Sequence, residues 1–141
     1  MKLSEAEIEK IASELDLGMI CHYHRVTGEL VCFPDPDNEY VDAEMWKDEI
    51  KKVKNDAKNY HRFEPMNSTE AFRVMEHFAE SLSDAPFASK LYKALANRRP
   101  FQGFKLLVDQ SDYREQWFDF KRIAYLQFVK EQSPIQLSDS D

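Results

Sequence analysis

The chain has 141 residues, which fits one domain of ordinary size with its own buried core. Hydrophobic residues make up 43% and aromatic residues 13%, which argues against global disorder, and only three glycines disfavour an all-β design with many tight turns. The formal net charge of −7 argues against bulk, sequence-independent binding to nucleic acid, because phosphate repels a net anion, although a local basic patch is not excluded.

The sequence also limits the cellular location that we expect. No apolar run approaches the roughly 20 residues that a membrane-spanning helix needs, and the first ten residues are charged throughout and have no secretory pattern. Two cysteines, Cys21 and Cys32, are too few for a disulfide scaffold and are expected to be reduced. We therefore expect a soluble cytoplasmic protein.

The first element in chain order is a helix. Residues 4–7, Ser-Glu-Ala-Glu, match a capping box, in which the serine caps the helix and the second glutamate reaches back. Apolar residues then share one face at helical spacing: Ile8, Ile11, Ala12 and Leu15. Gly18 is expected to end this helix, since glycine adopts a positive φ at little cost.

A β-hairpin is expected over residues 19–33, where the apolar period changes from helical spacing to two. Gly28 would take the left-handed position of a three-residue loop. In that register Arg25 pairs with Glu29, and one face, expected to be the core face, carries Cys21, Tyr23, Val31 and Phe33. A shift by one residue would exchange the faces of one strand.

The remaining elements are mostly helical. Asp42 is expected to cap a helix with an apolar stripe of Trp46, Ile50, Val53 and Ala57, and residues 60–64 are expected to form a third, edge strand before Pro65. Four helices are then predicted: from 67 to about 82, from 84 to about 97, over 100–108, and from 111 or 112 onward.

These elements together predict an α+β fold with a small antiparallel sheet of two to three strands, packed against about six helices, and with a helix-rich carboxy-terminal half. We expect a single domain over residues 1–132. Residues 133–141 are polar and are expected to form a disordered tail.

Several short stretches carry a resemblance to a known family. They are the Thr-Gly-Glu-Leu-Val of 27–31, the Arg-Phe-Glu of 62–64, the Met-Glu-His-Phe of 75–78, the Pro-Phe-Gln-Gly-Phe-Lys of 100–105 and the Trp-Phe-Asp-Phe of 117–120. The pattern, spread over roughly residues 18–129, resembles the bacterial uncharacterised protein family UPF0158. The family name implies no activity, cofactor or catalytic residue, so the resemblance supports a bacterial domain of unknown function.

The clearest anomaly is the charge of residues 85–108. This segment contains no acidic residue and five basic ones, Lys90, Lys93, Arg98, Arg99 and Lys105. The two arginines come just before the helix predicted to begin at Pro100, so its free amides and positive dipole end would add to the guanidinium charges. These residues are the candidate binding site for an acidic partner or another anion; the alternative is a solvated face that binds nothing.

Aromatic residues lie close to this segment in the sequence: Phe101, Phe104, Tyr113, Trp117 and Phe118. Interleaved basic and aromatic residues can stack nucleobases, which makes nucleic-acid binding an alternative function. A stripe at helical spacing is more typical of a core, and we interpret Trp117 as a core residue.

The hairpin offers a second candidate site, because His22, His24 and Cys32 would share one face in the predicted register and could bind zinc. No fourth ligand is evident, and one register shift would remove the thiol.

The chain has no P-loop, G-x-G-x-x-G, G-x-S-x-G or H-E-x-x-H motif, so neither catalytic residues nor a cofactor are assigned. The sequence therefore favours a non-enzymatic binding or regulatory module. Nucleic-acid binding, and an enzyme or metal site on the hairpin, are the alternatives.

Overall fold

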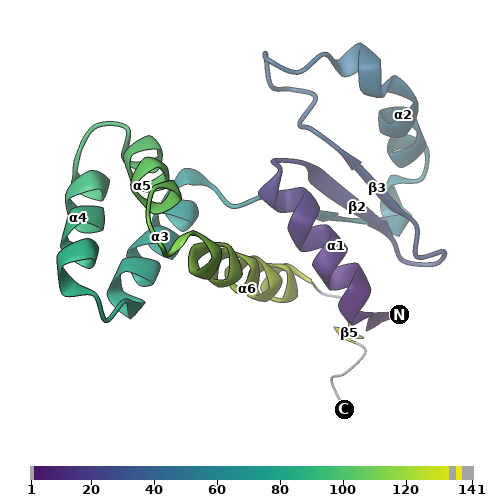
Figure 1. The fold of residues 1–141 in the computed structure, drawn as a ribbon. Helices are drawn as coiled ribbons and strands as arrows, with labels where there is room; N and C mark the ends of the chain where they lie inside the picture. Colours follow the sequence, from purple (N-terminus) through teal and green to yellow (C-terminus); the bar gives the residue numbers. More distant parts are fainter. Residues whose placement is uncertain (1, 134–135, 138–141) are drawn as a thin grey trace. The chain divides into compact units, whose positions relative to one another are not determined.

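The structure is a computed structural model that describes residues 2–133 and 136–137. Within these residues it contains six α-helices and a three-stranded antiparallel sheet, and four of the helices come after residue 66 (Figure 1). The predicted α+β fold class is therefore confirmed. No helix of the described residues is both long enough and apolar enough to cross a membrane.

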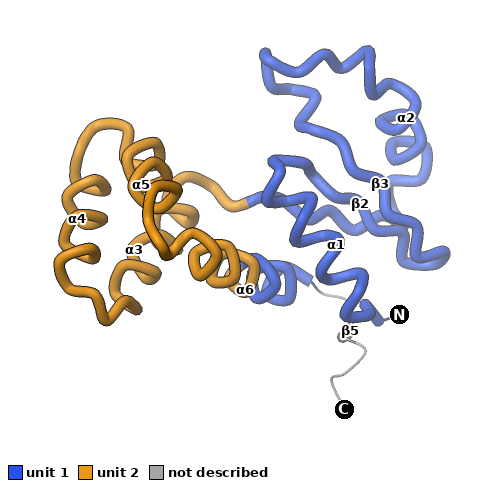
Figure 2. Tube along the Cα trace, in the orientation of Figure 1, with its two compact units in different colours: residues 1–65, 125–141 blue, residues 66–124 orange. Residues whose placement is uncertain are grey.

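Two compact units share the chain, one formed by residues 1–65 with 125–141 and the other by residues 66–124 (Figure 2). The long helix α6 (Arg114–Gln132) belongs partly to each. The single domain over residues 1–132 stays a prediction. Of the predicted tail, residues 134–135 and 138–141 lie outside the described residues, while β5 (Gln136–Leu137) pairs in parallel with β1 (Lys2–Leu3).

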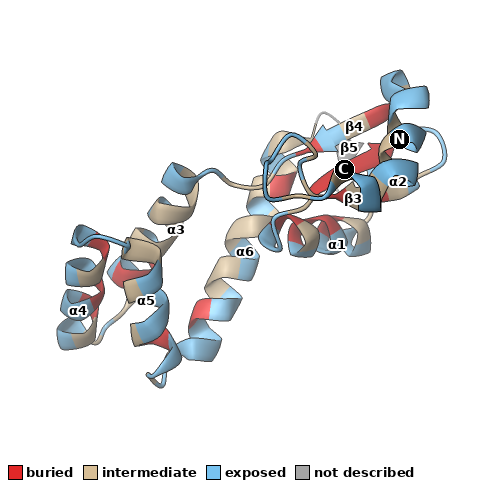
Figure 3. Ribbon diagram, turned by 90° about the horizontal axis from the view of Figure 1, so that it is seen from above, coloured by how far each residue is buried: buried red, intermediate tan, exposed pale blue. Residues whose placement is uncertain are grey.

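The first unit is built around the sheet, in which β2 (Ile20–His24) lies between β3 (Leu30–Phe33) and β4 (Tyr60–Phe63). The predicted hairpin and the predicted edge strand are thus both confirmed. All five residues of β2 are buried, because it is the central strand and both faces of the sheet are covered (Figure 3).

One face of the sheet packs against α1 (Glu5–Asp16) and the end of α6. Its core comprises Leu3, Ile8, Ile11, Ala12, Leu15, Cys21, Tyr23, Phe63 and Val129. The capping box predicted at the start of α1 is confirmed, because the Ser4 hydroxyl accepts from the Glu7 N–H and the Glu7 carboxylate accepts from the Ser4 N–H. Gly18 follows the helix with a φ of +87°, as predicted.

The other face packs against α2 (Lys47–Asn55). Val31, Phe33 and Tyr60 of the sheet contact Trp46, Ile50 and Val53. The expected cap, Asp42, accepts from the Glu44 N–H, but it begins a 3₁₀ turn, η1 (Ala43–Trp46), that precedes α2. Ala57 was wrongly predicted to continue the apolar stripe; it is exposed, in a second 3₁₀ turn, η2 (Ala57–Asn59).

The predicted register of the hairpin was wrong by one residue. Cys21 lies opposite Cys32 and Tyr23 opposite Leu30, so Val31 and Phe33 point to the α2 face and not to the face of Cys21 and Tyr23. The loop is longer than expected: the His24 N–H donates to the Glu29 carbonyl at 2.9 Å, and the Gly28 N–H donates to the His24 carbonyl at 2.9 Å. His24 therefore closes the turn, in place of the predicted Arg25–Glu29 pair.

The second unit consists of α3 (Ser68–Ser81), α4 (Ala85–Ala96), α5 (Pro100–Asp109) and the first part of α6. Asn67 and Glu70 form a capping box on α3, and the Asp84 carboxylate caps α4 by accepting from the Phe87 N–H. The core of this unit comprises Phe78, Ala79, Leu91, Leu95, Phe104, Val108 and Trp117.

Candidate functional site

The five basic residues predicted as the binding site lie on α4, on α5 and in the turn between these helices. The two helices pack closely, since a Cβ at Gly103 of α5 would lie 3.4 Å from the Ala94 Cβ of α4. Lys90 and Lys93 are exposed one helical turn apart on α4, and Lys105 is exposed on α5. The charge of Lys90 helps to lower the pKa of Asp84, after the larger effects of hydrogen bonds from Tyr113 and the Phe87 N–H.

Arg98 and Arg99 occupy the turn itself. Both are exposed, and neither makes an ion pair with a residue that the structure describes. Arg99 has a φ of +56°, a conformation in which a non-glycine residue is uncommon, because the chain must reverse between α4 and the proline that opens α5. Two guanidinium groups are therefore left to solvent at the start of a helix.

The amino terminus of α5 lacks the features that usually neutralise a helix start. No side chain caps it, its first turn contains no acidic residue, and Pro100 contributes no N–H group. By contrast, α3 begins with a complete capping box that includes the carboxylate of Glu70. The start of α5 thus keeps the positive end of its dipole, next to the arginine pair.

An open surface pocket of about 390 Å³ adjoins this turn. It is lined by Ser68, Thr69, Phe72, Arg73 and Glu76 of α3 and by Pro100 and Phe101 of α5. The pocket combines an apolar floor with two hydroxyl groups, one cation and one carboxylate. Glu76 would repel a small free anion, whereas a peptide can place an apolar side chain on the floor and its own charges elsewhere.

Arg73 is a site residue that the sequence did not single out. It lies on α3 between two glutamates of the same helix, Glu70 and Glu76, and outside the basic segment in sequence. Its exposed guanidinium makes no ion pair with a described residue. Only the packing of α3 beside the start of α5 brings it to the pocket, and no sequence spacing encodes that neighbourhood.

The neighbouring aromatic residues are mostly structural. Phe104 and Trp117 are 0% and 5% exposed, so the interpretation of Trp117 as a core residue is confirmed. Tyr113 stacks on Phe87 with ring centroids 5.0 Å apart. Of the five aromatic residues considered for base stacking, only Phe118 is exposed, and the Arg114 guanidinium lies 4.8 Å from its ring centroid. These positions do not provide a row of free rings for nucleobases.

The structure separates the three residues considered for a metal site on the hairpin. His22 and His24 do share a face, but the corrected register turns Cys32 to the opposite face, towards Cys21. His22 donates through Nδ1 to the Val31 carbonyl at 3.1 Å and stacks on Phe33. Within the described residues, no group of three or more His, Cys, Asp or Glu side chains is arranged to hold a metal ion.

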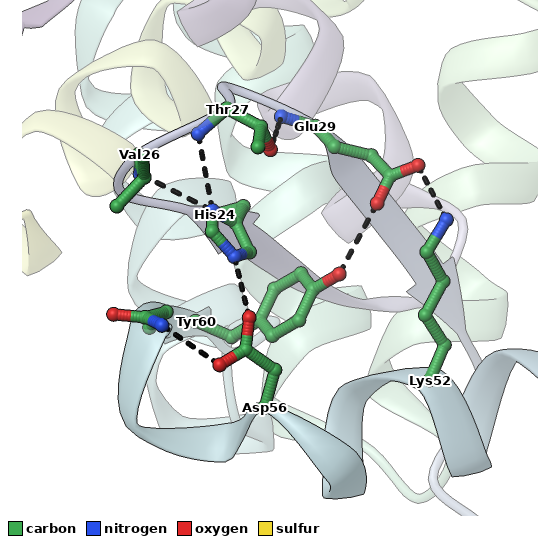
Figure 4. Close-up of polar contacts among 8 residues, drawn as sticks. His24, Val26, Thr27, Glu29, Lys52, Asp56 and Tyr60 are labelled. Atoms are coloured by element: carbon green, nitrogen blue, oxygen red, sulfur yellow. Dashed lines mark hydrogen bonds and ion pairs between the residues drawn. The ribbon is translucent and has the colours of Figure 1, made fainter.

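His24 is instead the centre of a polar clasp that joins the hairpin turn to the end of α2 (Figure 4). Its Nδ1 accepts from the N–H groups of Val26 and Thr27, at 3.2 and 3.1 Å, so its Nε2 carries the proton and donates to the Asp56 carboxylate at 2.7 Å. Hydrogen bonds from His24 and then Asn59 lower the pKa of Asp56. Both ring nitrogens are occupied, which leaves His24 no lone pair for general base catalysis.

A second part of the clasp lies on the same side of the turn. The Glu29 carboxylate accepts from the Lys52 ammonium at 2.6 Å and from the Tyr60 hydroxyl at 3.1 Å (Figure 4). These two bonds, with the one from Lys52 the stronger cause, lower the pKa of Glu29. The clasp therefore fixes the turn to α2 and β4 as a structural feature of the first unit.

Two other histidines, the buried His22 and the partly buried His61, make a testable contribution to the pH dependence of stability. Burial is the main cause that lowers the pKa of both His22 and His61 in the folded chain. The unfolded chain takes up these protons near pH 6.5 while the folded chain resists them, so the unfolded state binds more protons as the pH falls. We expect the free energy of unfolding to decrease between about pH 7 and pH 5, as measured by urea titration.

A matched pair of variants separates this cause from general acid effects. His61→Phe removes a partly buried titrating ring, whose Nε2 atom is buried without a hydrogen-bond partner among the described residues, and should flatten the pH dependence. His77→Gln changes an exposed histidine on α3 and should leave the slope as in the wild type. Equal slopes in all three proteins would show that His61 does not contribute to the effect.

Comparison with known proteins places the chain in a family without giving it an activity. No curated protein and no solved structure is significantly similar to it. One family model, described as "Uncharacterised protein family (UPF0158)", matches residues 4–136, which is nearly the whole chain. The match includes both the clasp around His24 and the α4–α5 turn with Arg98 and Arg99. The resemblance seen in the sequence is thus confirmed, and the chain belongs to the uncharacterised protein family UPF0158.

Proposed function

We propose that this protein is a non-enzymatic binding or regulatory module of the bacterial cytoplasm that recognises an acidic segment of a partner protein. The binding face comprises Arg98, Arg99, Lys105, Lys90 and Lys93. The observation that carries the proposal is the arginine pair of the α4–α5 turn: both side chains are exposed and unpaired among the described residues, at an uncapped helix start beside an open pocket.

Carboxylates fit this face for two physical reasons. Each guanidinium can hold a carboxylate through two parallel hydrogen bonds, and the start of α5 adds free N–H donors with a positive dipole end. Elsewhere the chain is strongly acidic and would repel the same partner, so the interaction is directed to one place.

The pocket beside the turn favours a peptide as the occupant over a free anion. Phe72, Pro100 and Phe101 offer apolar surface, and Arg73 offers one more cation. A segment with an apolar anchor followed by acidic residues would bury the anchor on the floor and place its carboxylates on the arginines.

The proposal predicts that the double variant Arg98→Ala, Arg99→Ala loses about tenfold or more in affinity for Asp/Glu-rich peptides with an apolar anchor, since two exposed charge pairs together contribute on the order of 1–2 kcal/mol. The measurement is fluorescence anisotropy against a set of such peptides. Lys51→Ala, Lys54→Ala is the matched control, because it removes the same charge from exposed residues of α2.

If both double variants bind acidic peptides as the wild type does, the proposed face is wrong. A mixed pool of RNA and DNA tests the alternative function with the same proteins. Affinity for that pool that falls steeply with salt and is lost in the arginine variant would replace the protein partner by nucleic acid.

A further inference from the structure

The two cysteines of the chain are held face to face across the hairpin. Cys21 of β2 and Cys32 of β3 are register partners, and their Sγ atoms lie 3.1 Å apart. Since His24 and Glu29 are joined by a ladder hydrogen bond, the alternation of an antiparallel pair makes 21 and 32 a non-hydrogen-bonded pair, whose Cα atoms approach most closely. That separation, about 4.5 Å, lies within the range that a disulfide spans without movement of the backbone.

The two thiols differ sharply in their access to solvent. Cys21 is 0% exposed on the central strand and lies under α1, with its Sγ 4.0 Å from the Ile11 carbonyl. Cys32 is partly exposed, because it lies on the edge strand β3. A reagent in solution can therefore reach Cys32 but not Cys21.

The pKa shifts of the two thiols also indicate that Cys32 reacts first. The pKa of Cys32 is lowered, first because the Cys21 S–H group can donate to its thiolate and then because of the charge of Lys10, against burial and Glu14. The pKa of Cys21 is raised, first by its hydrogen bond with Cys32 and then by burial. The accessible thiol is thus the one that ionises first, and the thiolate is the nucleophilic form.

We propose that Cys32 and Cys21 form a redox-active dithiol that a low-molecular-weight disulfide oxidises reversibly, with Cys32 as the attacking thiol and Cys21 as the resolving thiol. Oxidation would close a cross-strand disulfide between β2 and the edge strand β3. This modification site is in the first unit and is independent of the basic face proposed for partner binding.

The exchange needs no reactant beyond the small disulfide. The Cys32 thiolate attacks one sulfur of the reagent, the reagent's S–S bond breaks, and one small thiolate leaves and takes up a proton. The Cys21 sulfur then attacks the Cys32 Sγ and loses its proton, and the second small thiol leaves. Two protein thiols are oxidised, and one disulfide is reduced to two thiols.

The second step is favoured by the position of Cys21. Once Cys32 is in the mixed disulfide, it no longer carries the negative charge that holds the Cys21 proton, so two of the causes that raise the pKa of Cys21 disappear. The resolving sulfur is already next to the bond that it must attack. We therefore expect the mixed disulfide to be short-lived in the wild type.

Oxidised glutathione is the probe, and intact mass of the native full chain is the measurement. The wild type should lose two hydrogens, keep no glutathione and stay free of disulfide-linked dimers, and an excess of reduced glutathione should reverse the change. Cleavage after Arg25 separates the two cysteines, so a tryptic digest should contain peptides 11–25 and 26–47 joined by the new bond. A wild type that keeps glutathione or forms linked dimers would overturn the proposal.

Two single variants test the assigned roles. Cys21→Ser should accumulate glutathione on Cys32 as a stable adduct, whereas Cys32→Ser should stay unmodified on the same timescale. Equal modification rates in the two variants would overturn the order of attack. Because Cys21 is buried, circular dichroism is used to check that each variant folds. Cys21→Ala is a second variant that removes the same thiol. The mass measurement on the wild type does not depend on the folding of any variant.

Discussion

Phe78→Ala is expected to destabilise the second unit by about 3–5 kcal/mol, which is the upper end of what one substitution in a core costs. Phe78 is 0% exposed at the centre of an aromatic cluster. Its ring centroid lies 5.2 Å from that of Trp117, 5.4 Å from Phe120 and 6.2 Å from Phe104. Alanine would leave a cavity among large rings that cannot collapse into it, because they are fixed by two other helices, α5 and α6.

The loss is measurable by urea unfolding of the full chain, followed by circular dichroism and tryptophan fluorescence, to which Trp117 contributes from inside the cluster. Since whole domains are stable by only about 5–15 kcal/mol, such a loss would remove a large part of the free energy of unfolding. Phe118→Ala is the matched control, because Phe118 is 38% exposed next to Trp117 on α6. Similar losses for the two variants would contradict the assignment of Phe78 to the centre of this core.

The elements that the sequence predicted correctly are those that local chemistry determines. The caps at Ser4, Asn67 and Asp84 act on amides three residues away, and the apolar residues of α1 repeat at helical spacing. The end of α4 at Ala96 agrees with the prediction from Pro100, which disfavours the right-handed helical region for the residue before it. Such signals need no knowledge of the rest of the chain.

The hairpin register depended on an interaction that is distant in sequence. His24 closes the turn through its ring, and the ring is held by Asp56, 32 residues further along the chain. Turn composition alone, with Gly28 as its signal, suggested a three-residue loop. The one-residue error moved Cys32 into an apparent metal site and hid its true partner, Cys21, so the redox pair became visible only in the folded chain.

The candidate site also contains residues that the sequence predicted and residues that only the structure shows. A gap in acidic residues over 85–108 marked Arg98 and Arg99, because charge is counted along the sequence. The pocket beside them is formed by residues about 30 positions apart, from α3 and α5, and only helix packing sets that geometry. Arg73 and Phe72 accordingly had no sequence signal that distinguished them from ordinary residues of an amphipathic helix.

His24→Phe should have the second large effect, a loss of about 2–3 kcal/mol in the free energy of unfolding, since three hydrogen bonds at about 0.5–1.5 kcal/mol each are removed. Phenylalanine keeps an aromatic ring next to Tyr60, whose ring centroid lies 4.8 Å from that of His24 in an edge-on arrangement. The loss therefore reports the hydrogen bonds of the two ring nitrogens and not the packing. Urea unfolding measures it.

Two further variants show whether the ring acts by closing the turn. His24→Asn returns a short side-chain acceptor that can reach the Val26 and Thr27 N–H groups, so it should recover part of the stability. Lys52→Ala breaks an exposed ion pair of the same clasp and should leave the stability nearly unchanged. Native-state hydrogen exchange gives the local readout, because the Val26 and Thr27 amides should exchange faster in His24→Phe than in His24→Asn. If these amides exchange equally fast in both variants, the turn is held by its backbone and the ring is not its cap.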